Sequence, residues 1–400
     1  MPPASPSTAR ALNDRLALRL LQHEGPLTAG QLKTLTGLSR PTVADLVERL
    51  QGAGLVRVVG ESGSNRRGPN ARLYGIVAEQ AHLAAVDVRM NSVGVVVADL
   101  VGTTLAEAAA PIDESGGIER AVEQAAALVE RAARDAGVEK LHSVGIGAPG
   151  LIDPATGELR DSSGLPAWHR GLVVALQERH PATVLVENET NLAASAEQRF
   201  GAARDVDTFV LIWLSLGIGA AVVLDGKVRR GASGGAGELG FLPVPGTGEL
   251  PSADSCDGGF HSLGSSPAVT ELAASYGLFP SPDDSPEPPG ATLVRKAVTA
   301  VTTGTHDSAA DAFLDSLADR LALGAAAVAA VLDPGCVVLG GELGHAGGPE
   351  LAQRVQTRVA RLSPLHTQIR ATHLGGEAVL QGALLTAQQS AQDALFPSGG

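Results

Sequence analysis

Residues 39–43 have the side chains and the spacing of a helix start that can hydrogen-bond to DNA bases. Ser39 can cap such a helix, and Pro41 is tolerated in its first turn because the missing N–H would have no intrahelical partner there. In a helix-turn-helix, the first residues of the second helix reach base edges in the major groove. We therefore expect the DNA-contacting residues to be Ser39, Arg40, Thr42 and Val43, with Asp45 at the edge of reach.

The preceding sequence predicts the helices that hold these residues in place. An apolar stripe at near-helical spacing begins at Leu12 and breaks at Gly25-Pro26, which is a turn signal. Thr28 can cap a second, short helix that stops at Gly37, and the base-contacting helix follows directly. Two helices joined by a tight glycine-containing turn make a helix-turn-helix.

A wing is predicted after these helices. Residues 55–59 and 71–74 are typical of two short strands, and the loop between them contains Arg66-Arg67-Gly68-Pro69. Guanidinium groups on such a loop can enter a narrow minor groove. We therefore add Arg66, Arg67 and Gly68 to the expected DNA contacts.

The charge distribution favours DNA binding over the alternative, a helix-turn-helix used only for packing or dimerisation. Residues 1–75 contain ten Lys and Arg against five Asp and Glu, which is a net charge of +5. The other residues have a net charge of −18 within a total of −13. Because phosphate attracts positive charge, we expect DNA to contact the N-terminal segment and to be repelled by the body.

Composition restricts the class of protein. A chain of 400 residues with 44% hydrophobic content predicts two or three packed units. Cys256 and Cys336 are too few and too far apart for a disulfide framework, which fits a reducing compartment. The N-terminus has no apolar stretch of a signal peptide, and the longest apolar run, 321–332, is too short to span a bilayer. We therefore expect a soluble cytoplasmic protein with no membrane partner.

Residues 80–400 alternate predicted strands and helices, which indicates an α/β fold with ligands near the strand ends. Their motifs read GIGAPGLID, SSGLPAW, VENETN, GIGAAVVLDGKVRRGASGGAGELG and VVLGGEL, in this order. With these motifs the chain resembles the ROK family (repressors, open reading frames and sugar kinases), in particular its branch of xylose and N-acetylglucosamine repressors. The resemblance implies two actin-like, ribonuclease-H-like ATPase lobes with a sugar between them.

The resemblance also implies a division of the chain. We expect a disordered N-terminus at 1–10, a winged helix-turn-helix at 11–78, a first lobe at 79–200 and a second lobe at 201–375. We expect a C-terminal helix at 376–392 to pack back on the first lobe. The Pro-rich residues 280–290 are expected to form a mobile loop in the second lobe.

The phosphate loop and the base that the resemblance implies for a kinase are altered. The family pattern has Asp followed by Gly-Gly-Thr, whereas Asp87 is followed by Val88-Arg89-Met90-Asn91, so Cβ atoms stand where backbone should meet phosphate. The catalytic Asp is replaced by Glu189, and displacing a base by about an ångström can cost roughly two orders of magnitude in rate. We expect no bound ATP, no catalytic residue and no enzyme activity.

The sugar contacts implied by the resemblance are altered as well. Gly164 stands where the family has an Asn, and Phe241 replaces the His of a Glu-x-Gly-His motif. A polar site discriminates by the groups that a wrong ligand leaves unpaired, so we expect an effector other than the family's commonest sugars in their usual pose. The expected effector-binding positions are Gly164, Asn188, Glu189 and Glu238. In the alternative, the pocket is vestigial and Glu238 is only structural.

The zinc ligands of the family are mostly missing. The resemblance implies one His and three Cys, but Phe241 cannot ligate and only Cys256 remains. Asp254 and His261 lie near the other ligand positions, so a three-ligand site is conceivable. Because structural zinc favours thiolate and imidazole donors, we expect a metal-free loop.

Together these features predict a DNA-binding transcriptional regulator, expected to be a repressor in carbohydrate metabolism. We expect a homodimer or a dimer of dimers, a palindromic double-stranded operator and a sugar or sugar derivative as effector. One alternative is a regulator with a vestigial pocket that a protein partner controls. A less favoured alternative is an ATP-dependent carbohydrate kinase with an appended helix-turn-helix.

Overall fold

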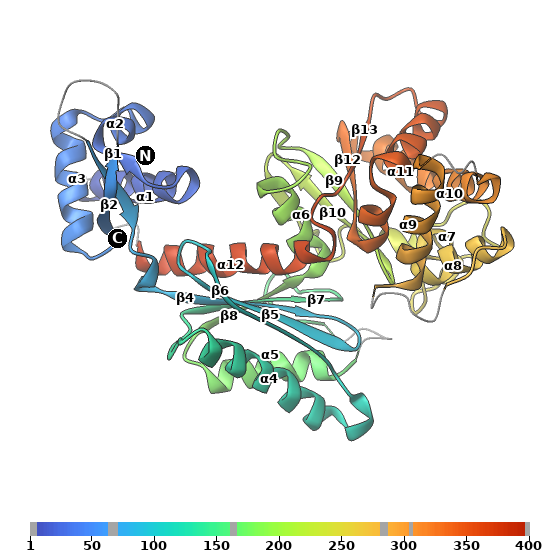
Figure 1. Cartoon of the computed structure of the whole chain (residues 1–400), viewed down its shortest axis with the longest axis horizontal. Helices are drawn as coiled ribbons and strands as arrows, with labels where there is room; N and C mark the ends of the chain where they lie inside the picture. The colour runs from blue at the N-terminus through green and yellow to red at the C-terminus, as the bar shows by residue number, and fades with distance from the viewer. Residues whose placement is uncertain (1–5, 63–70, 161–165, 281–286, 304–306, 397–400) are drawn as a thin grey trace.

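The computed structural model describes residues 6–62, 71–160, 166–280, 287–303 and 307–396. Its parts are arranged along the C-terminal helix α12 (Ala378–Leu395), with an N-terminal domain at one end and two α/β lobes beside and beyond the helix (Figure 1). The fold class is therefore the one that the sequence predicts.

The N-terminal domain (residues 6–76) is a winged helix-turn-helix. Its elements are α1 (Pro6–Glu24), β1 (Leu27–Thr28), α2 (Ala29–Thr36), α3 (Arg40–Gly52), β2 (Val56–Ser62) and β3 (Ala71–Ile76), with strand order β1-β3-β2. The helices pack through one apolar core that includes Leu18, Leu32 and Leu46.

The predicted helix ends of this domain are confirmed. The Thr28 hydroxyl accepts a hydrogen bond from the Gln31 N–H at 3.2 Å, and the Gln31 side chain accepts one from the Thr28 N–H at 2.9 Å, which together make a capping box. Gly37 ends α2 in the left-handed region at φ 71°. Ser39 caps α3 by accepting from the Thr42 N–H.

One prediction for the N-terminus is wrong. We expected residues 1–10 to be disordered and the helical pattern to begin at Leu12, but α1 begins at Pro6, so the prediction is wrong for residues 6–10, while residues 1–5 lie outside the described residues. Proline is favoured at the first helical position because its fixed φ suits the helix, and the following Ala9 and Ala11 are strong helix formers. Residues 6–10, which we expected to be disordered, therefore form the start of α1.

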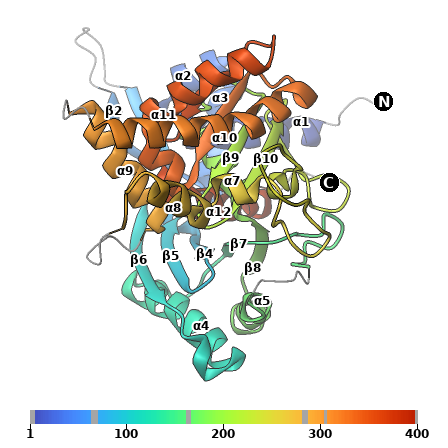
Figure 2. The same ribbon diagram turned by 90° about the vertical axis from the view of Figure 1, so that its right-hand side faces the viewer.

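Lobe 1 (residues 78–199) has a five-stranded sheet in the order β6-β5-β4-β7-β8, in which β4, β7 and β8 are parallel. Helices α4 and α5 cover the face of this sheet that points away from lobe 2 (Figure 2). Its elements are η1 (Ala78–Gln80), β4 (His82–Val88), β5 (Ser92–Asp99), β6 (Thr104–Pro111), η2 (Glu114–Gly116), α4 (Ile118–Asp135), β7 (Ser143–Ala148), α5 (Trp168–Arg179), β8 (Thr183–Asn188) and α6 (Glu189–Arg199).

Lobe 2 (residues 209–377) repeats the same design, with sheet order β11-β10-β9-β12-β13 and parallel pairing among β9, β12 and β13. Its first elements are β9 (Phe209–Leu214), β10 (Ile218–Leu224), β11 (Lys227–Arg229), η3 (Leu239–Phe241), α7 (His261–Gly264) and α8 (Ser266–Ser275). The remaining ones are α9 (Pro289–Thr302), α10 (Ser308–Leu332), β12 (Cys336–Gly340), α11 (Gly341–Leu362), β13 (Gln368–Ala371) and η4 (Gly375–Glu377).

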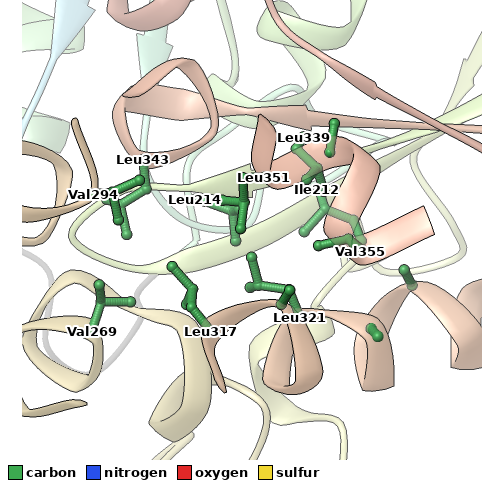
Figure 3. Packing of buried hydrophobic residues seen from close by; sticks show 14 of the residues in the cluster. Ile212, Leu214, Val269, Val294, Leu317, Leu321, Leu339, Leu343, Leu351 and Val355 are labelled. Carbon is green, nitrogen blue, oxygen red and sulfur yellow. The ribbon is translucent and has the colours of Figure 1, made fainter. Parts of the chain in front are cut away.

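The core of lobe 2 lies between its sheet and the helices α8 to α11. Ile212 and Leu214 of β9 face Leu317 and Leu321 of α10, while α11 adds aliphatic side chains such as Leu351 (Figure 3). Small residues along α10 let the helices approach closely, which fits the low aromatic content of 3%.

The prediction of a mobile loop at 280–290 is wrong at its C-terminal end, because α9 begins at Pro289. Proline is tolerated in the first turn of a helix, and the Gly290 N–H donates to the Ser266 hydroxyl at 2.9 Å. Residues 281–286 lie outside the described residues.

Helix α12 packs across the lobe 1 sheet on β4 and β7 and runs alongside α6. A Cβ at Gly145 would lie 2.1 Å from the Ala383 carbonyl oxygen, so only glycine permits this approach of strand and helix. The Ser143 hydroxyl donates to the Ala387 carbonyl at 2.8 Å. In the described part of the chain, no helix has both the length and the apolarity that a membrane crossing requires.

Candidate DNA-reading surface and interlobe junction

The start of α3 presents one arginine to solvent. Arg40 is exposed, and its guanidinium has no ion-pair partner among the described residues. Thr42 is half-buried, and its hydroxyl lies 2.8 Å from that of Ser39, so both hydroxyls take part in the helix cap. The position and freedom of Arg40 therefore suit a contact with a base or a phosphate.

Val43 does not belong to this surface. The sequence predicted it as a DNA contact, but its side chain is only 2% exposed and packs in the core of the N-terminal domain. The helical period explains the correction, because Val43 lies on the same helix face as the core residues Leu46 and Leu50. Asp45, which we placed at the edge of reach, is exposed two positions after Val43 along α3.

The wing residues Arg66, Arg67 and Gly68 lie outside the described residues, so their DNA contacts stay a prediction. The strands that hold the wing are described: β2 and β3 pair antiparallel up to Ser62 opposite Ala71. The register shifts between Val58 and Gly60, which is a bulge of the kind that increases strand twist.

The second candidate site is the interlobe junction, where the ends of β4 and β8 in lobe 1 meet α11 and the loop before η3 in lobe 2. Asn188 caps α6 by accepting from the Thr190 N–H at 2.9 Å. Its amide group donates to the Gly150 carbonyl at 3.0 Å and to the Glu189 carboxyl at 2.9 Å. The Asn188 amide is thus fixed in place and orients Glu189.

Three carboxyl groups influence one another at the junction. Burial raises the pKa of Glu189 to about 8, and the nearby charges of Asp87 and Glu238 add to the increase. Partial burial also raises the pKa of Glu238, which keeps an accessible face. At neutral pH Glu189 is therefore mostly protonated, so it can donate a hydrogen bond but is a poor proton acceptor.

Arg89 closes one side of the junction. Its Nε donates to Asp87 at 2.8 Å, one terminal nitrogen donates to Glu342 at 2.7 Å and the other donates to the Gly376 carbonyl at 3.0 Å. Asp87 belongs to lobe 1, whereas Glu342 lies in the first turn of α11 in lobe 2. The sequence showed that Arg89 interrupts the phosphate loop, but Glu342 and Gly376 are 253 and 287 residues away, so the bridge itself carried no local signal.

Arg230 makes a second bridge between the lobes that the sequence analysis did not anticipate. Its Nε, directly after β11, donates to the Glu187 carboxylate at 2.6 Å. The other oxygen of Glu187 accepts from the Asn191 amide group at 3.0 Å. Each of the two guanidinium groups at the junction is therefore already paired with carboxylate.

The remaining predicted site residues do not form a metal centre in the described structure. Phe241 is 38% exposed in η3. Among the described residues, no group of three or more His, Cys, Asp or Glu side chains is arranged to hold a metal ion. Gly164 lies outside the described residues, and its role stays a prediction.

A winged helix-turn-helix joined to two α/β lobes of one design defines the class of molecule. The chain belongs to the ROK family: residues 83–390 match the model of that family. Residues 12–68 match the model of the MarR family, which covers most of the N-terminal domain.

Similar proteins include both regulators and kinases. The DNA-binding transcriptional dual regulator NagC of Escherichia coli K12 is 28% identical over 60% of this chain and 59% of its own length. The xylose repressor of Bacillus subtilis is 26% identical over 60% and 62%. The chain thus spans about three-fifths of the length of the curated relatives it matches.

Two solved structures show the fold. A ROK family transcriptional regulator, described as a homologue of the Escherichia coli MLC protein, superposes with a TM-score of 0.73 at 21% identity, covering 97% of this chain and 98% of that one. A ROK hexokinase from Thermus thermophilus has a TM-score of 0.61 at 28% identity, covering 78% of this chain and 99% of its own. The first likeness includes the N-terminal domain, whereas the second covers a share of the chain close to that of the two lobes.

Proposed function

We propose that this protein is a DNA-binding transcriptional repressor whose two-lobed body binds a sugar or a sugar derivative. The observation that carries the proposal is the exposed Arg40 at the start of α3, which has no ion-pair partner among the described residues and lies on a basic domain, while the body is acidic. The names of the similar repressors support the same function.

Kinase activity is the weaker candidate, although some structural neighbours are kinases. Transfer of a phosphoryl group needs a free cationic or backbone cradle and an ionised base. Arg89 fills its position with three internal hydrogen bonds, and the pKa of Glu189, about 8, keeps that carboxyl mostly neutral. These two residues support a sensor rather than an enzyme.

The effector is proposed to bind at the interlobe junction, where Asn188 holds Glu189 in place and Glu238 is accessible. Only a ligand with different affinities for two arrangements of the lobes can shift the protein between them. In the competing proposal the junction binds nothing and a protein partner controls DNA binding; its support is the internal pairing of both junction arginines.

Genome-wide mapping of DNA bound by the full chain tests the main proposal, followed by gel shifts on the recovered sites. Arg40→Ala should weaken specific binding by about 1–3 kcal/mol, as expected for loss of one base contact. Arg134→Ala, which removes an exposed arginine from α4 of lobe 1, is the matched control and should leave affinity unchanged. If both variants bind DNA with the affinity of the wild type, the assignment of α3 to the DNA interface is contradicted.

A further inference from the structure

The junction has more carboxyl groups than cations to balance them. Asp87, Glu187, Glu189, Glu238 and Glu342 meet there, and the guanidinium groups that pair with them are those of Arg89 and Arg230. With Glu189 protonated, the other four carboxyl groups still outnumber the two guanidinium groups, although burial also raises the pKa of Asp87 and of Glu238 and so reduces the excess of negative charge. A bound anion would therefore be repelled, whereas a cation would be attracted.

The hydrogen-bond inventory points the same way. Glu342 is 5% exposed, and only one of its carboxylate oxygens accepts from Arg89. Its other oxygen is buried and has no hydrogen-bond partner among the described residues, and the same holds for the side-chain oxygen of Asn191. Buried acceptors without donors are costly, so a ligand that supplies N–H or O–H groups is favoured.

The arginines do not change this balance. Arg89 contacts two carboxylates and a carbonyl, and Arg230 contacts Glu187, so the positive charge of each guanidinium is already balanced by carboxylate. A phosphate that bound either guanidinium would share it with a carboxylate already paired there, and the two anions would repel each other. The ion pairs of Arg89 and Arg230 thus disfavour phosphorylated ligands, and this exclusion contributes to the specificity of the site.

We propose, building on the effector role proposed above, that the interlobe junction selects a cationic, hydroxyl-bearing ligand such as an amino sugar with a free ammonium group. Its hydroxyls donate to the junction carboxyl groups and its ammonium lies among Asp87, Glu238 and Glu342. Arg89 and Arg230 act as specificity-determining residues, because their pairing removes the counter-charge that a phosphorylated ligand needs.

The test is thermal unfolding of the full chain at pH 6.5 with three probes that share one sugar ring: D-glucosamine, N-acetyl-D-glucosamine and D-glucosamine 6-phosphate. A ligand that binds only the folded state raises Tm by mass action. We expect D-glucosamine to raise Tm by at least about 2 °C at saturating concentration. The neutral and the phosphorylated probes should each give a smaller shift.

Two variants identify the contacts. Glu238→Gln should reduce the shift caused by D-glucosamine to that of the neutral probe, since it removes charge and keeps shape. Asp205→Asn removes a carboxylate that pairs with Arg370 away from the junction, and should leave the shift intact. Circular dichroism of each variant without ligand shows that it is folded.

Each outcome separates the two levels of the proposal. An equal or larger shift with either of the other probes would overturn the preference for a cation while leaving a sugar effector in place. No shift with any probe would contradict both the cationic ligand and the effector role. DNA binding in gel shifts does not depend on these results, so the reading of operator DNA is judged separately.

Discussion

At the scale of single residues, Arg89 has a structural role at the position where the family resemblance implies a phosphate loop. A side chain at this position does more than block backbone from approaching a phosphate, because its guanidinium connects Asp87 in lobe 1 to Glu342 in lobe 2. Burial raises the pKa of Asp87 even though Arg89 opposes the increase. Arg89 is held by one hydrogen bond each to Asp87, Glu342 and the Gly376 carbonyl, and its removal would leave the two buried carboxyl groups without a counter-ion.

The pH dependence of stability should identify Glu189. Its pKa rises from the ordinary 4.5 to about 8 on folding, so folding takes up a proton between these values. Its contribution to stability is fully present below about pH 4.5 and is lost as the pH rises to about 8. Glu189→Gln should therefore flatten the decrease in Tm between pH 5 and pH 8, measured by differential scanning calorimetry.

Asp205→Asn is the control for that sign. Arg370 lowers the pKa of Asp205, so its contribution is present at neutral pH and is lost only as the pH falls. Asp205→Asn should therefore lower Tm by a similar amount across pH 5–8, and its difference from the wild type should shrink only at the acid end, where the wild type loses this contribution. A Glu189→Gln profile parallel to that of the wild type across pH 5–8 would contradict the raised pKa.

At the scale of elements, the sequence predicts the helix ends of the N-terminal domain correctly, because each depends on contacts between neighbouring residues. Thr28 and Ser39 begin helices and Gly37 ends one, each through contacts with residues only a few positions away. Such contacts can be predicted from the sequence because residue type and spacing determine them. Val43 shows the limit of this approach, since a helix start supplies both base contacts and core residues and only the packed helix separates them. The bridges of Arg89 and Arg230 join residues far apart in the chain, and no spacing rule indicates them.

The seat of α12 on the body should be sensitive to a single methyl group. A Cβ at Gly382 would lie 2.0 Å from the Leu192 carbonyl oxygen of α6, so the helices would have to separate. Gly382→Ala should destabilise the protein by about 1–3 kcal/mol through overpacking. Chemical denaturation of the full chain measures the change.

Gly52, near the end of α3, is the matched helical control, because a Cβ there meets nothing within 4 Å. Gly52→Ala should stabilise the N-terminal domain by about 0.4–1 kcal/mol, since alanine has less backbone freedom to lose. If both substitutions have the same sign, close contact with α6 does not govern the position of α12.

At the scale of the whole molecule, α12 ties the N-terminal domain to the body. Its C-terminal end reaches that domain, where Asp393 pairs with Arg15 and Gln392 donates to Gln22. Phe396, directly after the helix, shares the core of the domain with residues of α1 and α3. The domain therefore does not hang on a flexible linker, and its orientation follows that of lobe 1.

This connection leads to a prediction about the operator if the protein acts as the homodimer that we expect from its sequence. Two domains held rigidly by a two-fold symmetric pair of bodies must read half-sites at one fixed separation, near one helical turn of about 34–36 Å or a multiple of it. Inserting about 5 base pairs between the half-sites turns the second one to the opposite side of the duplex, and should lower affinity at least about tenfold toward non-specific binding. Inserting about 10 base pairs returns both half-sites to the same side of the duplex and is the control for added length alone.

Gel shifts on these synthetic operators, with sedimentation to count the protein chains in each complex, give the measurement. Equal affinity for every spacing would mean that the domains bind independently of the body, and that α12 does not fix their position.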